Sequence, residues 1–150
     1  MALNWLTTNL ANARAKLSDE IGKFRNREMM EAVVAGCAIV AAADGAVSAA
    51  EKQKMIGFLQ NSAELKVFKM EDVIASFNAY VAKFDFDPEI GRGEALRAIA
   101  KLKGKAGADR LLVRVCIAIA NSDGSFDASE RTAISTICRD LGLAPADFDL

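Results

Sequence analysis

Histidine is absent from this chain, and several other residues that often carry chemistry are scarce: one tryptophan, one tyrosine, two prolines and three cysteines among 150 residues. Without histidine, neither a Ser-His-Asp nor a Cys-His catalytic arrangement can form, and the commonest metal ligand in proteins is missing. The side-chain ligands that remain abundant are the carboxylates of Asp and Glu, whose oxygens suit hard cations such as calcium and magnesium.

The three cysteines, Cys37, Cys116 and Cys138, are odd in number and lie within apolar helical patterns. They form no Cys-x-x-Cys pair of the kind found in thiol-disulfide enzymes and zinc sites. We therefore interpret them as reduced core residues of a cytosolic protein.

Other absences exclude whole classes of function. The net charge of -1 gives no reason to expect nucleic-acid binding. The sequence contains no uninterrupted apolar run of the ~18 residues that a membrane-spanning helix needs. The N-terminus also lacks the compact apolar region and cleavage site of a signal peptide, so none is expected.

An acidic turn occurs twice in the chain. The first copy runs from Asp44-Gly45 to Glu51, and the second runs from Asp123-Gly124 to Glu130. In both copies an apolar helical run leads into the turn and an amphipathic run leads out of it. The register extends to the cysteines, since Cys37 matches Cys116. A shared Asp-Gly pair would mean little alone, but this in-register pattern indicates an internal duplication.

The sequence predicts an all-α fold in a single domain over residues 1–150. The expected architecture is a duplicated helical bundle of about seven to eight helices, with two similar repeats around 28–84 and 105–150. The helices expected at 28–43 and 109–121 are apolar on most sides, so they should pair at the centre. Further helices are expected at 49–61, at 70–84, from Asp87-Pro88 to about Lys103, and at 128–141 with Gly142 as its C-cap.

Residues 1–27 form a separate N-terminal element in this scheme, with an amphipathic helix at 3–25. Its apolar residues recur every three or four positions, Trp5 lies near that stripe, and Arg and Lys side chains flank it. Two interpretations are open: a helix packed on the domain, or a surface that meets a membrane or a partner helix.

The acidic turns are the strongest candidate site. Compared with an EF-hand calcium loop, the second copy supplies Asp123, Asp127 and Glu130 at suitable positions, and its glycine permits the sharp turn. However, Ile119 and Val40 stand where the first Asp of each loop should be. We therefore expect weak binding of a divalent cation, most plausibly Ca²⁺, through the carboxylates of Asp44, Glu51, Asp123, Asp127 and Glu130.

A simpler interpretation of the same residues involves no metal. Ser48-x-x-Glu51 is a capping-box pattern, and Asp127-x-x-Glu130 is its close relative, so these side chains can satisfy backbone N–H groups where a helix begins. The Asp residues before the glycines can serve only to shape the turn. A second acidic group, formed by Asp85, Asp87 and Glu89, is weaker because Asp87 before Pro88 is explained as an N-cap.

Several long strings resemble the TerB family of tellurite-resistance proteins. They include the first acidic turn and the helix after it up to Leu59, the strings Glu64–Phe68 and Ser122–Asp127, and Phe84-Asp85-Phe86-Asp87-Pro88-Glu89-Ile90-Gly91. The similarity covers nearly the whole chain and is weakest over the first 25 residues. The resemblance implies a duplicated all-helical bundle and a cytosolic component of the tellurium-resistance and stress-response system, which is also linked to phage and colicin resistance.

The same resemblance implies association with the inner membrane through an integral membrane protein of the TerC type. It also implies a role in divalent-cation binding for the acidic residues that match Asp44, Glu51, Asp123 and Glu130. It brings no catalytic activity with it. The sequence therefore favours a cytoplasmic, non-enzymatic protein, peripheral on the inner membrane. The alternatives are a metal-independent interaction scaffold and, less favoured, direct tellurite sequestration or reduction, since tellurite is an anion and the repeated sites are acidic.

Overall fold

Helices account for all the regular secondary structure in the part of the chain that can be described. The computed structural model of this protein describes residues 27–43, 47–61, 66–105, 107–121 and 126–150. Within these ranges there is no strand, and the chain forms six α-helices and one short 3-10 helix: α3 (Arg27–Ala41), α4 (Ala49–Asn61), α5 (Met70–Phe86), α6 (Pro88–Ala100), α7 (Ala108–Ala120), α8 (Ala128–Asp140) and η2 (Pro145–Phe148).

The two most apolar helices, α3 and α7, pack against each other in the interior. Eleven residues of α3 are buried, and nearly all of α7 is buried as well. The two helices are in close contact at Gly36, where an added Cβ would lie 2.6 Å from the Sγ atom of Cys116. Such a short separation is possible only because Gly36 has no side chain. The predicted pairing of two central apolar helices is therefore confirmed by these contacts.

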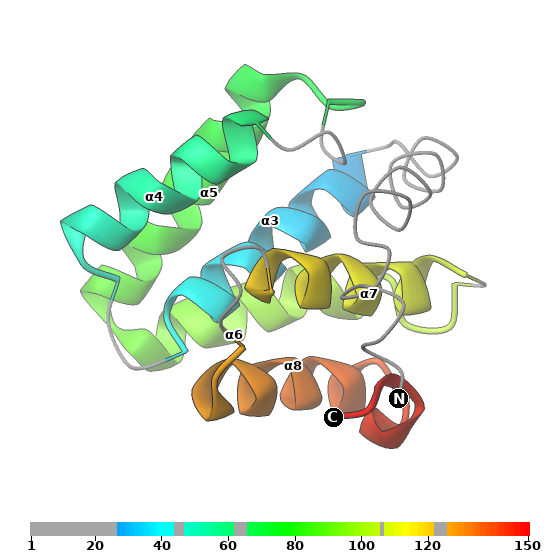
Figure 1. Ribbon diagram of the computed structural model, residues 1–150. Coiled ribbons are helices and arrows are strands. Elements are labelled where there is room, and N and C mark those ends of the chain that lie inside the picture. Colours follow the sequence, from blue (N-terminus) through cyan, green and yellow to red (C-terminus); the bar gives the residue numbers. More distant parts are fainter. Residues whose placement is uncertain (1–26, 44–46, 62–65, 106, 122–125) are drawn as a thin grey trace.

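The remaining helices surround this pair (Figure 1). α4 and α5 pack together on one side of α3, whereas α7 and α8 pack together on the other side. α6 lies against α3 and α5 and also contacts α8. The core is continuous across these helices, with Phe77, Leu59, Ile99 and Ile134 among its largest fully buried side chains. None of the described helices is long and apolar enough to span a membrane.

The break predicted around Asp87-Pro88 is sharper than the sequence suggested. α5 continues to Phe86, so only Asp87 separates it from Pro88, the first residue of α6. The Asp87 carboxylate accepts hydrogen bonds from the backbone N–H groups of Glu89, at 2.9 Å, and Ile90, at 3.5 Å. These bonds satisfy donors that the first turn of a helix leaves unpaired. The predicted N-cap is therefore confirmed, and it joins two helices through a single residue.

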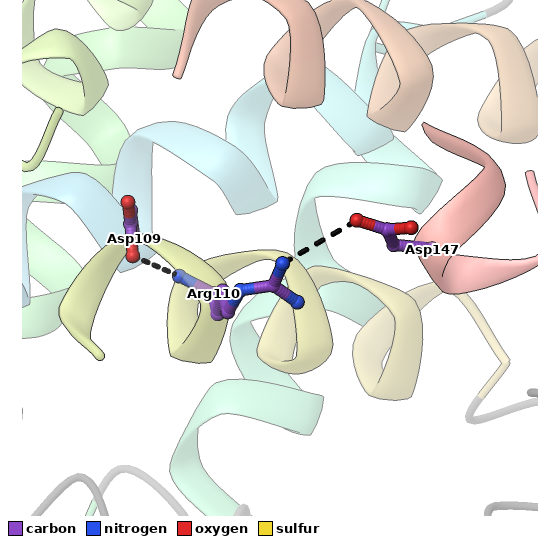
Figure 2. Close-up of polar contacts among 3 residues, drawn as sticks. All are labelled: Asp109, Arg110 and Asp147. Carbon is purple, nitrogen blue, oxygen red and sulfur yellow. Dashed lines mark hydrogen bonds and ion pairs between the residues drawn. The ribbon is translucent and has the colours of Figure 1, made fainter. Parts of the chain in front are cut away.

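The C-terminal segment is fastened to α7 and α8. Gly142, at φ 75°, follows α8, and the Leu143 N–H donates to the Cys138 carbonyl at 2.8 Å. This pattern is a Schellman motif, which confirms the predicted C-cap. Beyond it, Arg110 on α7 makes an ion pair with Asp147 of η2 at 3.3 Å, while the Asp109 carboxylate accepts from the Arg110 backbone N–H (Figure 2).

Most predicted helix bounds agree with the structure to within two residues, and the largest difference is at the end of α6. That helix ends at Ala100, three residues before the expected Lys103, because the chain turns through residues 101–104. The predicted helix at 3–25 lies outside the described residues. For that reason the expected count of about seven to eight helices, like the internal duplication, stays a prediction.

Candidate metal site at the acidic turns

The beginning of α8 holds the two predicted site residues that can be described fully. Asp127 is the N-cap residue, and its Oδ1 atom accepts a hydrogen bond from the Glu130 backbone N–H at 2.8 Å. In return, the Glu130 carboxylate accepts from the Asp127 backbone N–H at 3.1 Å. Together these bonds form a capping box, as the metal-free interpretation predicts. The capping bond is made by Oδ1 of Asp127.

The outgoing helix of the first copy begins at the matching position. α4 starts at Ala49, and the Lys52 N–H donates to the Ser48 carbonyl at 2.9 Å. Glu51 lies in the first turn of α4. Its side chain is outside the described part of the structure, as are Asp44 and Asp123 entirely. Among the residues that are described, no group of three or more Asp, Glu or Cys side chains is arranged to hold a metal ion.

A cavity brings together the segments that flank the two turns. It has a volume of about 330 Å³ and lies between the end of α3, the beginning of α8 and the side of α6. Ala42 and Ala43, which precede the first acidic turn, line it together with Ala128 and Ser129, which follow the second turn. The chain therefore enters the first acidic turn and leaves the second acidic turn at the same cavity.

The chemistry of the cavity wall limits where a cation could sit. The wall presents polar and apolar surface in similar amounts: Ile39, Phe84 and Leu96 supply apolar surface, and Ser129, Thr132 and Thr136 carry hydroxyl groups. Arg92 is the one charged side chain on this wall among the described residues. Because a guanidinium repels a metal cation, the interior of the cavity is a poor metal site. The candidate carboxylates that suit a hard cation belong to the two acidic turns and to the first turns of the helices after them, whereas the lining of the cavity contains no carboxylate among the described residues.

The cysteines lie apart from any solvent-exposed site. All three are buried, and burial raises the pKa of the Cys37 thiol to about 12 and that of Cys138 to about 11. Burial also raises the pKa of Cys116 well above its usual value, with a further contribution from Cys37. Because the thiolate is the reactive form, these thiols are poor nucleophiles and poor metal ligands at neutral pH.

The cavity itself was not predicted from the sequence. Its walls come from α3, from α5 and α6, and from α8, three regions that are distant along the chain, and neither Arg92 nor Thr132 stands in a motif that would mark it. In the sequence, both residues occupy polar positions of an amphipathic helix pattern, as ordinary surface residues do. The one available signal was the duplication, which implied that the turns could meet but gave no means of placing them.

Comparison with known proteins identifies the family. The family described as "Tellurite resistance protein TerB" matches residues 30–150. A curated relative named "Tellurium resistance protein TerB", from Alcaligenes sp., is 47% identical over 108 residues, which cover 72% of this chain and 88% of the relative. No solved structure matches the chain significantly. The matched range includes both acidic turns and all the described helices except the first three residues of α3, so the chain belongs to the TerB family of tellurite-resistance proteins.

Proposed function

We propose that this protein is a non-enzymatic, cytoplasmic component of the tellurite and stress-resistance system. In this proposal it binds a divalent cation weakly through its duplicated acidic turns and also binds a membrane-associated partner of the TerC type, which places it peripherally on the inner membrane. Family membership supports the link to tellurite resistance. The cation and the partner come from the resemblance and from the chemistry of the acidic residues.

One observation carries the cation proposal: the segments flanking both turns line the same cavity. Two separate sites of two or three carboxylates each would hold a divalent cation poorly. If the turns lie as close as their flanks, the carboxylates of Asp44, Glu51, Asp123 and Glu130 can contribute to a shared set of oxygen ligands, with Asp127 beside them. Oxygen-only ligands favour calcium or magnesium over zinc or copper. Because the first Asp of each EF-hand-like loop is missing, we expect a dissociation constant on the order of 10⁻⁴–10⁻³ M.

Calorimetric titration of calcium tests this site. Wild type should release or absorb heat at millimolar calcium, and the variant Asp44→Asn/Asp123→Asn should not, because Asn preserves the turn but removes the charge. The matched control is Asp85→Asn/Glu89→Gln. It removes two exposed carboxylates, that of Asp85 at the end of α5 and that of Glu89 at the beginning of α6. Equal heats from wild type and the turn variant would show that the turns bind no cation.

The membrane partner is tested separately by deleting residues 1–20. We expect the deletion to lower co-sedimentation of the protein with vesicles that contain the partner, because the apolar stripe and flanking basic residues of this segment suit an interface. Unchanged co-sedimentation would assign this segment to the domain core alone.

A metal-independent scaffold is the second candidate, and the capping box favours it directly. Asp127 and Glu130 already have a structural role, since each accepts a hydrogen bond from the other's backbone N–H. Direct tellurite reduction is less favoured because the buried, protonated thiols offer no accessible reductant. Mass spectrometry of the native protein after alkylation distinguishes thiol chemistry, because rapid labelling of any cysteine would be evidence for it.

A further inference from the structure

The corner between α5 and α6 exposes two large apolar side chains. Phe86, the last residue of α5, is 81% exposed, and Ile90, in the first turn of α6, is 46% exposed. They are the only large hydrophobic residues of the described chain that are exposed to this degree, and they lie at the same corner. Figure 1 shows this corner as the turn from α5 into α6 at one end of the molecule. Exposed apolar residues gathered in one place indicate an interaction site.

The backbone of this corner is held firmly. Asp87 caps α6 with its carboxylate, and its own N–H donates to the Lys83 carbonyl at 3.0 Å. Pro88 fixes the first helical position of α6. Gly91 lies so close to Phe84 that an added Cβ would be 2.6 Å from the Phe84 Cα atom. Because these features fix the backbone beside Phe86 before any partner arrives, binding there would cost little backbone entropy.

The charges around the corner select the kind of partner. Asp85 and Glu89 are exposed on either side, and Asp87 is half-buried between them. The nearest basic residues are Lys83 and Arg92, which flank this acidic run; Lys83 makes an ion pair with Glu94 at 3.6 Å, and Arg92 lines the cavity, so the run itself keeps a negative charge. A bilayer with anionic headgroups would be repelled by these carboxylates, whereas a protein surface with basic side chains would be attracted. Exposed aromatic residues that enter a pocket are typical energetic centres of protein interfaces.

We propose that the α5–α6 corner is a docking surface for a partner protein that presents an apolar pocket rimmed by Lys or Arg side chains. Phe86 and Ile90 supply the apolar contact, and Asp85 and Glu89 supply the flanking charges. The inference deepens the proposed function and rests on it in one respect, that the protein acts by binding a partner. It does not depend on cation binding, since the corner and the acidic turns use different residues.

The experiment places a photoreactive group at the corner of the full-length protein in its host cells. Phe86 is replaced by p-benzoylphenylalanine, and the control carries the same group at Ala100, an exposed residue at the other end of α6. Irradiation should link Phe86, but not Ala100, to a distinct protein. The linked peptide, identified by mass spectrometry, should combine apolar residues with a net positive charge.

Charge reversal then tests the complementarity. Asp85→Lys/Glu89→Lys should lower the cross-link yield by about tenfold, because it juxtaposes like charges. Glu71→Lys/Asp140→Lys changes the net charge equally at two other exposed sites and should leave the yield unchanged. The proposal is overturned by cross-links only to lipid or to a second copy of this chain, by a yield no higher than at Ala100, by an acidic contact peptide, or by equal effects of the two charge reversals.

Binding of the purified partner gives the final measurement. Phe86→Ala should raise the dissociation constant at least tenfold, a value typical of an anchor residue, while its circular dichroism spectrum stays that of wild type because the side chain is exposed. The calcium titration of Phe86→Ala should match wild type. A variant that loses the partner but keeps calcium separates this inference from the cation proposal, and an unchanged dissociation constant would refute the docking surface.

Discussion

Two glycines in α6, Gly91 and Gly93, should respond in opposite ways to the same substitution. An alanine at Gly91 would place its Cβ 2.6 Å from the Phe84 Cα atom and 2.7 Å from the Phe84 backbone N. Non-bonded carbon atoms prefer separations of ~3.5–4.0 Å, so the overlap approaches 1 Å. Two of the three clashing atoms belong to the backbone of α5, so no side-chain rotation can relieve it. α6 must instead move away from α5. At Gly93 an added Cβ would meet no atom within 4 Å.

The magnitudes follow from two opposing terms. Replacing glycine by alanine inside a helix stabilises it by ~1 kcal/mol, because alanine has less backbone freedom to lose on folding. Overpacking costs ~1–3 kcal/mol, and contact with backbone belongs at the upper end of that range. Gly91→Ala should therefore lower the free energy of unfolding by ~2 kcal/mol. Gly93→Ala should raise it by ~1 kcal/mol, which leaves a difference of ~3 kcal/mol between the two variants.

Urea denaturation followed by circular dichroism at 222 nm measures both variants. In a thermal melt of the same variants, a difference of ~3 kcal/mol in a domain of this size would correspond to ~6–12 °C in melting temperature, which is well above experimental error. The slope of the unfolding free energy against urea concentration should be the same in both variants and wild type, so that a shift in the midpoint reports a change in stability alone. If both variants were stabilised equally, Gly91 would be an ordinary helical position and the close contact between α5 and α6 would be wrong.

Three other predictions concern the core, the cap and the thiols. Gly36→Ala should destabilise the wild-type protein by ~1 kcal/mol, because the new Cβ would lie 2.6 Å from the Sγ atom of Cys116. The same substitution should stabilise the Cys116→Ala variant, which lacks that sulfur atom. Additive effects of the two substitutions in a double-mutant cycle would contradict the contact. Asp127→Ala should lower the urea midpoint by an amount equivalent to ~1 kcal/mol, whereas Asp127→Asn should change it little because Asn can also cap a helix. Equal losses of stability in both variants would show that the capping hydrogen bond is not the cause. Stability should fall as pH rises from 9.0 toward about 11, because the Cys37 and Cys138 thiols keep their protons in the folded state after the unfolded state has lost them. In Cys37→Ala the slope of unfolding free energy against pH should be shallower by ~1.4 kcal/mol per pH unit over that range, and an unchanged slope would show that this thiol ionises equally in both states.

The fold could be predicted largely from local patterns. Apolar residues at helical spacing located the helices, and Asp87-Pro88 marked where α6 begins, because caps and prolines act through their immediate neighbours. Tertiary relationships could not be predicted in this way. Phe84 and Phe86 look alike in the sequence, yet Phe84 is 7% exposed and Phe86 is 81% exposed. The difference depends on where α5 ends relative to α6, which no local pattern specifies.

The candidate site was predictable only in part, for a related reason. The capping box at Asp127 and Glu130 involves residues three positions apart, so its pattern is visible in the sequence. The cavity between the ends of α3 and α8 depends on packing between distant segments. The same holds for Gly91, whose role as a point of close contact between helices is evident only from the position of Phe84.

The burial of every thiol has a consequence for how this protein can behave under chemical stress. Oxidation of cysteine to a sulfenic acid or a disulfide requires both thiolate character and access, and Cys37, Cys116 and Cys138 have neither. The cysteines are therefore redox-inert, and the protein should keep its shape while the thiol balance of its cell is disturbed. Any information it conveys about such a disturbance must arrive through what it binds, because the chain has no accessible thiol that could record the oxidant directly.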